Sequence, residues 1–366
     1  MIKAKEHETI CDFDSLEAIV YGGSILGGGG GGFLAEGLET VKLALGIGKP
    51  RIISLSQVAP NESLVMVATV GAPAGRNRFV KAEDFIGAVR KLIEASPCRV
   101  SGIITNEMGG RASANGLIQS AVLGLPIVDA PANGRAHPFG LMGSLGLHKD
   151  QNYFSIQAAF GGNPDRKEHL ELLVSGEIGR CDSLIREASI HAGGLVAVAR
   201  NPVRASWLAR HAAVGAIKFA LNLGITYLES LKRKGGAPAE EIASCLGGEV
   251  LAKGKVTSFE LSTRSGFDVG LMILDTGHEL TFCNEYITVE KSKKRLYTFP
   301  DLITTIDASS NLTINTAEIS VGMSLAVVCS KRENLILGEG MRDPKLFEIL
   351  EGVIGLPIMQ YAFDGI

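Results

Sequence analysis

The chain has 366 residues, of which 46% are hydrophobic and 20% are charged, and its formal net charge is -3. This length is enough for two domains, each with its own core. The charge gives no electrostatic reason to bind nucleic acid or an anionic membrane surface. No uncharged apolar run approaches the roughly 18 residues of a membrane span, and the first residues lack the apolar core of a signal peptide. Six scattered cysteines without a CxxC pair are typical of reduced thiols. We therefore expect a cytoplasmic protein with neither nucleic acid nor a membrane as partner.

Near the N-terminus, Asp14 is a plausible N-cap for a helix over residues 15–24. A run of six glycines follows, and a helical pattern then extends from Phe33 to Leu45. A glycine run that opens a helix exposes backbone N–H groups at the positive end of the helix dipole, where an anionic group is favoured. The alternative is a tight connection between two helices. The candidate substrate-binding residues in this run are Gly28, Gly29, Gly30 and Gly31.

The next part of the chain alternates between strand and helix patterns. Apolar runs predict strands over residues 51–55, 63–70, 100–105 and 127–128, and helices are predicted over 82–95 and 111–123. This alternation predicts a layered α/β domain with a largely parallel sheet. A polar, charged stretch over residues 161–180 sets the boundary, so we expect a first domain over 1–165.

The second half begins with helical patterns and ends with short alternating runs. Helices are predicted over 181–192 and 202–234, the latter divided near Gly224. From Lys255 onward, short strands are predicted over 256–261, 267–274, 279–283, 286–289, 296–298 and 325–329, before a last helix over 344–350. We therefore expect a C-terminal α+β domain, rich in short β-strands, over 166–366.

Two acidic residues directly follow predicted parallel strands. Glu107 and Asp129 lie just past the carboxyl ends of neighbouring strands, where open α/β sheets bind their ligands. Either could act as a general base. The alternatives are a helix cap for Glu107 and a salt bridge to Arg135 for Asp129. Arg135 could also grip a substrate carboxylate with its planar fork.

Histidines and amides complete the candidate set. Imidazole and carboxylate are suitable ligands for a divalent metal such as zinc, so Asp129, His137 and His148 form a possible metal site, although their spacing matches no compact motif. His137 is also a candidate catalytic proton donor, and the alternative for both histidines is a hydrogen-bonded loop position. Further substrate-binding candidates are Asn106, His191 and Asn284. His191 could equally serve as a cation at the end of a helix.

Five ordered motifs carry a family resemblance. They are the glycine run, Asn106-Glu107-Met108-Gly109-Gly110, residues 124–129, residues 134–138, and a C-terminal set that includes Phe282-Cys283-Asn284-Glu285-Tyr286. Together they resemble the S-methyl thiohydantoin desulfurase family, over nearly the whole chain. The resemblance implies a two-domain protein associated with hydantoinases and oxoprolinases. Two departures indicate a subgroup with its own substrate: Pro131 replaces the second acid of an Asp-Ala-Asp motif, and His137 and Phe139 flank Pro138 where Phe and an acid are usual.

The leading hypothesis is a homo-oligomeric hydrolase that acts on a five-membered cyclic ureide or its sulfur analogue, a thiohydantoin or S-alkyl thiohydantoin, with a carboxylate arm. Water would attack the ring carbon that bears sulfur, and sulfide or a thiol would leave. Glu107 or Asp129 would be the base, His137 the proton donor or metal ligand, and Arg135 the group that holds the arm. The alternative is a non-catalytic, ligand-binding subunit or partner of a hydantoinase- or oxoprolinase-type enzyme. A nucleotide-dependent enzyme is less favoured, because no Gly-Lys-Ser/Thr ends the glycine run.

Overall fold

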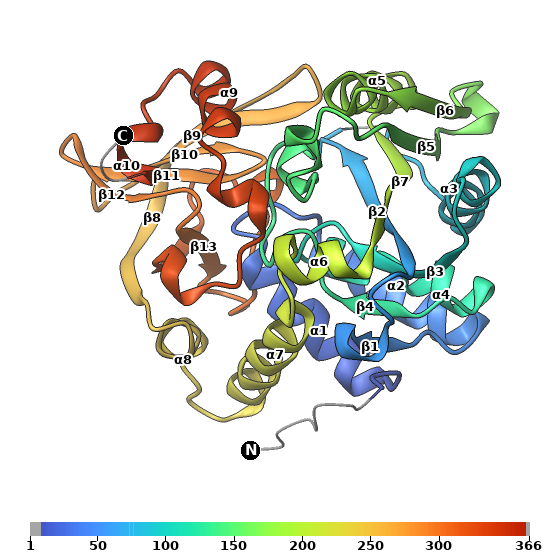
Figure 1. Cartoon of the computed structure of the whole chain (residues 1–366). Helices are drawn as coiled ribbons and strands as arrows, with labels where there is room; N and C mark the ends of the chain where they lie inside the picture. The colour runs from blue at the N-terminus through green and yellow to red at the C-terminus, as the bar shows by residue number, and fades with distance from the viewer. Residues whose placement is uncertain (1–8, 73, 76, 364–366) are drawn as a thin grey trace.

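The computed structural model describes residues 9–72, 74–75 and 77–363, and it contains two seven-stranded sheets with helices around and between them (Figure 1). The first sheet has the order β1-β4-β3-β2-β7-β5-β6. Its strands are β1 (Ile52–Ser54), β2 (Ser63–Gly71), β3 (Val100–Thr105), β4 (Ile127–Asp129), β5 (Ser155–Gly161), β6 (Leu170–Gly176) and β7 (Leu195–Arg204). β1, β4, β3 and β2 are mutually parallel. β7 is antiparallel to both β2 and β5, so β5 again runs in the direction of β2 and the sheet is mostly parallel, as expected.

Both faces of this sheet are covered, which explains why β2 is a nearly continuous apolar run. Val65 and Val67 pack with α3 (Ala82–Ala95), whereas Leu64 and Met66 face α6 (Ala205–His211) and the segment after β4. α5 (Ile178–His191) covers the end formed by β5, β6 and β7. Parallel strands buried on both faces are the usual arrangement of a layered α/β domain.

The first sheet continues beyond the boundary expected at residue 165. β5 and β6 form an antiparallel hairpin, and β7 then returns between β5 and β2. A division at residue 165 would therefore cut this sheet between β5 and β6. The helix expected over 202–234 is also corrected: β7 extends to Arg204, and two helices, α6 and α7 (Ala216–Lys232), follow it.

The second sheet has the order β12-β11-β10-β9-β8-β14-β13 and is antiparallel. Its strands are β8 (Glu249–Arg264), β9 (Phe267–Leu274), β10 (His278–Cys283), β11 (Glu285–Lys291), β12 (Lys294–Thr298), β13 (Leu302–Asp307) and β14 (Ser324–Ser330). The first part of β8 pairs with β14 and the second part with β9. The long strand β8 therefore carries the sheet around a single apolar core.

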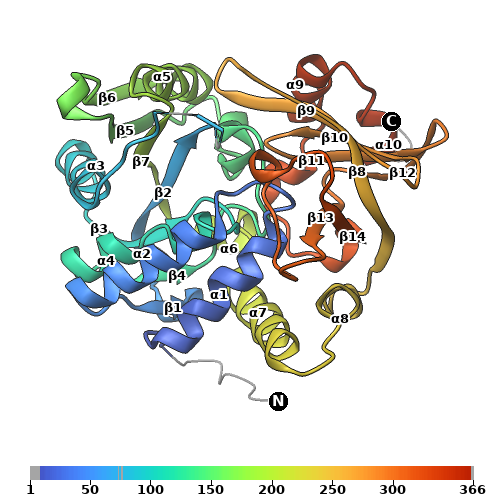
Figure 2. The ribbon, with the colours of Figure 1, turned by 180° about the vertical axis from the view of Figure 1, so that it is seen from behind.

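Two helices lie where the sheets meet. α1 (Phe13–Leu26) packs against α7, and Figure 2 shows both at the junction of the two halves. Their core includes side chains from both sheets, such as Ile127 and Leu302. The N-cap of α1 is Asp12, whose carboxylate accepts from the Ser15 amide at 2.8 Å, and not Asp14 as expected.

The remaining helices differ only in part from the expected pattern. α2 (Leu34–Ile47) follows the glycine run. The helix expected over 111–123 is a 3-10 turn (Ala112–Ala114) followed by α4 (Leu117–Leu123), because Gly116 adopts a left-handed φ of 97° between them. α8 (Pro238–Cys245), α9 (Pro344–Ile354) and α10 (Met359–Ala362) flank the second sheet. Among the described residues, no helix is long and apolar enough to cross a membrane. The homo-oligomer remains a prediction.

Candidate active site

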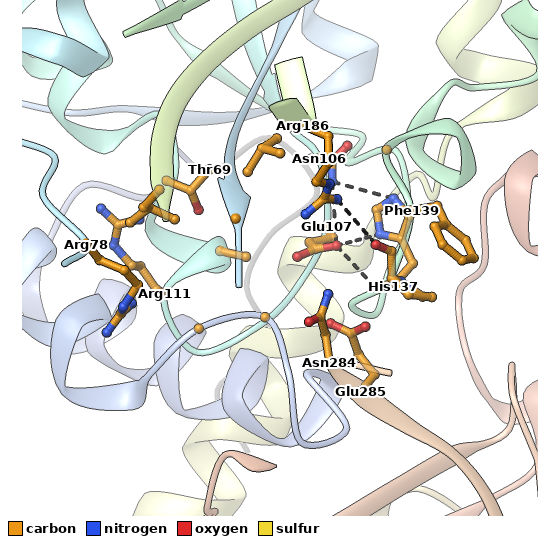
Figure 3. Close-up of a pocket in the computed structure, with 18 of the residues that line it drawn as sticks. Thr69, Arg78, Asn106, Glu107, Arg111, His137, Phe139, Arg186, Asn284 and Glu285 are labelled. Atoms are coloured by element: carbon orange, nitrogen blue, oxygen red, sulfur yellow. Dashed lines mark hydrogen bonds and ion pairs between the residues drawn. The ribbon is translucent and has the colours of Figure 1, made fainter. Parts of the chain in front are cut away.

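A cleft of about 660 Å³, including its open mouth, lies beyond the carboxyl end of β3, between the two halves of the chain (Figure 3). The position agrees with the general rule for open α/β sheets. Its polar and charged lining residues are Glu36, Thr69, Arg78, Asn106, Glu107, Arg111, His137, Arg186, Arg200, Asn284 and Glu285. Asn284 and Glu285 come from the second sheet, so both halves of the chain build the cleft.

Glu107 and His137 form a close pair at one side of the cleft. The Glu107 Oε2 atom lies 2.5 Å from His137 Nδ1 and also accepts the His137 backbone amide at 3.1 Å. The other oxygen, Oε1, accepts no hydrogen bond from the residues that the structure describes. The Glu107 side chain is 14% exposed and the His137 side chain 1%. Both residues line the cleft, but Glu107 is the more exposed of the two, and the buried His137 holds Glu107 Oε2 in place.

Glu285 is a second carboxyl group in the same cleft; it belongs to a motif of the sequence, but only its neighbour Asn284 was predicted to bind substrate. It starts β11 and is buried, and the Gly31 amide donates a hydrogen bond to it. Burial, reinforced by the charge of Glu107, raises the pKa of Glu285 well above its usual range, against the opposing effect of Arg135. One cleft thus holds a partly exposed carboxylate and a buried carboxyl group that favours its protonated form. In the sequence, the only indication of a role for Glu285 was its position next to Asn284 in a motif that resembles the family.

Asn106 and Arg200 extend the Glu107–His137 pair into the first sheet. Arg200, on β7, donates from Nη2 to Asn106 Oδ1 at 2.9 Å and from Nη1 to Asp182 Oδ1 at 2.9 Å. The Asn106 Nδ2 atom lies 3.5 Å from both His137 Nε2 and Glu107 Oε2. Asn106, expected to bind substrate, lines the cleft and is buried within this network.

Arginines form the remaining walls of the cleft. Figure 3 shows Arg78 and Arg111 at the side opposite His137. Both are ion-paired with Glu36, at 3.1 Å and 3.5 Å respectively. The Nη1 atom of Arg111 is buried and has no hydrogen-bond partner among the described residues. Arg186 donates to the Gly266 carbonyl at 3.2 Å and packs over the Phe267 ring. Sequence reasoning missed these cations, because nothing local distinguishes them from surface arginines.

The glycine run connects the two halves of the chain through its carbonyl groups. The carbonyl of Gly28 accepts from the Tyr286 amide, and the carbonyl of Gly29 accepts from the Thr316 amide, both at 2.8 Å. A Cβ on Gly30 would lie 2.2 Å from Glu285 Oε1. Of the four glycines expected to bind substrate, only Gly31 lines the cleft. The run permits close backbone approach, which is nearer to the alternative of a tight connection.

Arg135 does not line the cleft. It is fully buried, and its guanidinium donates to the carbonyls of Ala136 at 3.2 Å, Pro300 at 3.1 Å and Asp301 at 2.5 Å. It also lies over the Phe299 ring. Burial lowers its pKa to about 10, against the opposing charge of Glu285. The expected grip on a substrate carboxylate is thus corrected, because Nε and Nη1 bind backbone carbonyl groups, and Nη2, which has no hydrogen-bond partner among the described residues, is buried away from the cleft.

The three expected metal ligands contact different parts of the molecule. The Asp129 carboxylate accepts from the amides of Ile217 and Lys218 at 2.7 Å and 3.2 Å, and so caps α7. His148 lies 2.6 Å from Asp343 Oδ2 and 2.6 Å from Ser144 Oγ. No group of three metal-ligating side chains occurs in the described part of the chain. The donor set therefore does not fit a shared ion, and we derive no step through a metal.

Asp129 was also expected to act as a base, but its carboxylate caps α7 and does not line the cleft. Two further residues were expected to bind substrate. His191 is exposed at the end of α5, beside Glu187 at 3.3 Å, and does not line the cleft. Asn284 does line it, and its Oδ1 accepts from the Asp268 amide at 3.0 Å while the backbone adopts a left-handed φ of 58°.

Comparison with known proteins places this geometry in a family. A crystal structure of a protein from Chromobacterium violaceum matches with a TM-score of 0.65 at 20% identity, covering 94% of this chain and 96% of that chain. At this identity the likeness shows the fold. No curated protein matches the chain. Models of the S-Me-THD-like N-terminal and C-terminal domains match residues 14–163 and 177–341. With both domain models matched in order over nearly all of its length, the chain belongs to the S-Me-THD-like family, the S-methyl thiohydantoin desulfurase family that its motifs resemble.

Proposed function

We propose that this protein is a hydrolase that removes the sulfur substituent from an S-alkyl thiohydantoin. The observation that carries the proposal is the pair of carboxyl groups in unlike environments, Glu107 and Glu285, within one cleft. Two carboxyl groups whose environments separate their pKa values are a common basis for acid and base roles. The family name supports a thiohydantoin-related activity in general.

In the proposed reaction, Glu107 acts as the general base. Its Oε2 is held by His137, so Oε1 is available to take a proton from a water molecule. The water oxygen forms a bond to the ring carbon that carries sulfur. The electron pair of the former C=N bond moves onto the ring nitrogen in the resulting tetrahedral species.

In the second step the carbon–sulfur bond breaks, the hydroxyl oxygen becomes the carbonyl oxygen, and the hydroxyl proton passes to the ring nitrogen. The sulfur leaves with its bonding electrons, and Glu285 supplies the proton that converts it to a thiol. Burial and the Glu107 charge favour the protonated form of Glu285 that this role needs. Water and substrate thus give a hydantoin and a thiol, and the proton held by Glu107 restores Glu285 through solvent.

The test measures thiol release from two substrates that differ in leaving group, an S-methyl and an S-(4-nitrophenyl) thiohydantoin. Glu107→Gln should lower kcat for both by about 10²-fold or more, since the base is lost. Glu285→Gln should do so only for the S-methyl substrate, because 4-nitrothiophenolate leaves without a proton. Glu187→Gln, which changes an exposed carboxylate on α5, is the control and should have no effect.

Wild-type protein that is stabilised by these rings but releases no thiol would overturn the proposal in favour of the non-catalytic ligand-binding partner. Equal losses of kcat in Glu285→Gln on both substrates would remove Glu285 from the acid role.

We further propose that a carboxylate arm of the substrate binds Arg78 and Arg111. These cations lie across the cleft from His137, and Arg111 Nη1 is buried without a hydrogen-bond partner among the described residues. Arg111→Lys keeps the charge but loses the planar fork. We expect KM for a ring with a carboxylate arm to rise by an amount equivalent to roughly 1.5–3 kcal/mol, with little change for the unsubstituted ring. Equal changes of KM for both rings would show that Arg111 acts through its ion pair with Glu36 and not on the substrate arm.

A further inference from the structure

A line of hydrogen-bonding groups runs from helix α5 through the first sheet to the proposed base. It passes from Asp182 through Arg200, Asn106 and His137 to Glu107. Three members, Arg200, Asn106 and His137, are buried, so solvent does not compete for their hydrogen bonds.

The direction of the line is fixed at Arg200. A guanidinium only donates hydrogen bonds, so the Asn106 atom that faces it at 2.9 Å must be the oxygen Oδ1. The amide nitrogen Nδ2 of Asn106 must then face His137 Nε2, at 3.5 Å. Nδ2 is a donor, and His137 Nε2 must therefore be the unprotonated nitrogen that can accept.

The other ring nitrogen of His137, Nδ1, faces Glu107. Nδ1 lies 2.5 Å from Glu107 Oε2, and although its N–H is not aimed well enough to make a hydrogen bond of ordinary geometry, two unprotonated atoms would repel each other at this distance, so the proton belongs on Nδ1. The tautomer with hydrogen on Nε2 would place two donors against each other at Asn106 and a lone pair against the carboxylate at Glu107. The doubly protonated ring would repel the Asn106 amide. Only the neutral Nδ1–H form satisfies both neighbours.

We propose that Asn106, held by Arg200, is a positioning residue that fixes His137 as the neutral Nδ1–H tautomer, so that His137 orients Glu107 as a hydrogen-bond donor. The catalytic part of this inference rests on the proposed function. The tautomer itself does not, because it follows from the contacts of His137 alone.

Gly143 packs closely against the contact between Asn106 and His137. A Cβ at this position would lie 2.2 Å from Asn106 Oδ1 and 2.8 Å from His137 Nε2. The backbone of the segment after Pro138 therefore covers the Asn106–His137 contact closely. With Nε2 covered, His137 acts on the cleft through Glu107.

The experiment combines ¹⁵N NMR of the histidine ring nitrogens with steady-state kinetics. The His137 signals are assigned by their loss in His137→Gln. In the wild type we expect a pyridine-type Nε2 and a pyrrole-type Nδ1. Asn106→Asp places an acceptor against Nε2, so Nε2 should become protonated, and kcat should fall by about 10²-fold with little change in KM.

Arg200 supplies the matched variants. Arg200→Lys retains a donor toward Asn106 Oδ1 and should keep both the wild-type ring signals and most of kcat. Arg200→Met frees the amide to turn over, and its signals and kcat should follow those of Asn106→Asp. Thermal unfolding of each variant shows whether the fold is retained.

A protonated Nε2 in the wild type, or an unchanged pyridine-type Nε2 in Asn106→Asp, would overturn the inference. So would a tautomer switch with unchanged kcat, which would leave Asn106 without influence on Glu107. If the wild type releases no thiol at all, the proposed function fails, and the ring signals alone still decide the tautomer.

Discussion

At the scale of single residues, buried charges in this protein divide into those that meet the cleft and those that hold the chain together. Glu285 has a raised pKa and a surface on the cleft, so its ionisation is available to chemistry. Asp129 and Arg135 are also buried, but neither lines the cleft: backbone amides donate to the Asp129 carboxylate, and backbone carbonyls accept from Nε and Nη1 of Arg135. A perturbed pKa therefore indicates function only when the group also reaches a cavity.

Asp129 offers a stability test of this distinction. Burial raises its pKa to about 6, above the usual 3.8, despite two amide donors from α7. A carboxyl group with a raised native pKa binds more protons when folded, so it lowers the free energy of unfolding as pH rises from about 4 to about 6. Asp129→Asn keeps a capping oxygen and removes this dependence. We expect the variant to gain up to roughly 2–3 kcal/mol relative to wild type between pH 4 and pH 7.

Urea denaturation of both proteins across this pH range measures the effect. A difference between the two proteins that stays constant with pH would show that Asp129 is ionised throughout and acts as an ordinary cap. Asp129→Ala, which loses the cap itself, should be about 1 kcal/mol less stable than Asp129→Asn at every pH.

The sequence located some of the candidate site because chain order and space coincide there. Asn106 and Glu107 directly follow a buried strand, and a parallel sheet delivers such residues to one edge. Asp129 follows a strand in the same way, but α7 begins beside it, and the Ile217 amide of α7 donates a hydrogen bond to its carboxylate. Arg111 and Arg200 are brought to the cleft by tertiary packing, which no local pattern records.

At the scale of elements, the contact between α1 and α7 depends on two glycines. A Cβ on Gly22 would lie 1.8 Å from the Ala220 carbonyl oxygen, and a Cβ on Gly224 would lie 1.7 Å from that of Ala18. The helix backbones therefore approach directly. Gly224, where the sequence suggested a division, lies inside a continuous helix, and it is there to permit contact rather than to break the helix.

Gly224→Ala should therefore destabilise the protein although alanine favours helix. The helices would have to separate, at a cost of roughly 1–3 kcal/mol for an overpacked site. Gly352→Ala is the matched control, since Gly352 lies in α9 with open space at its Cβ. That change should stabilise by roughly 0.5–1 kcal/mol. Thermal unfolding of the two variants should thus shift in opposite directions, and a stabilised Gly224→Ala would contradict the close packing.

Elements with strong periodicity were predictable, and those that depend on tertiary neighbours were not. α3 runs over the expected residues 82–95, because it has acidic residues in its first turn and a clear apolar face. β7 was missed because Pro202, a residue type common at the first position of a helix, lies inside the strand, whereas α6 begins only at Ala205. β6 is an edge strand that is only half-buried, so its apolar alternation is weak.

At the scale of the whole molecule, the cleft exists only while the two halves are docked. Its walls come from β2, the loop after β3, α5 and β7 on one side and from the β10–β11 turn on the other. The glycine run and Arg135 join these halves through backbone hydrogen bonds. The sequence indicated two units, but their junction involves contacts between residues more than 160 positions apart, which local patterns do not reveal.

Arg135→Met tests this joining role and separates it from substrate binding. The variant loses the hydrogen bonds to Pro300 and Asp301 and leaves Glu285 without its nearby cation. Removing one member of a buried charged group costs roughly 3–5 kcal/mol, so the denaturation midpoint should fall well below that of Arg90→Met, a change on the exposed face of α3. Because Arg135 does not line the cleft, kcat/KM should fall by similar factors for rings with and without a carboxylate arm. A loss confined to the carboxylate-bearing ring, with stability unchanged, would instead return Arg135 to the substrate-binding role that its sequence position first suggested.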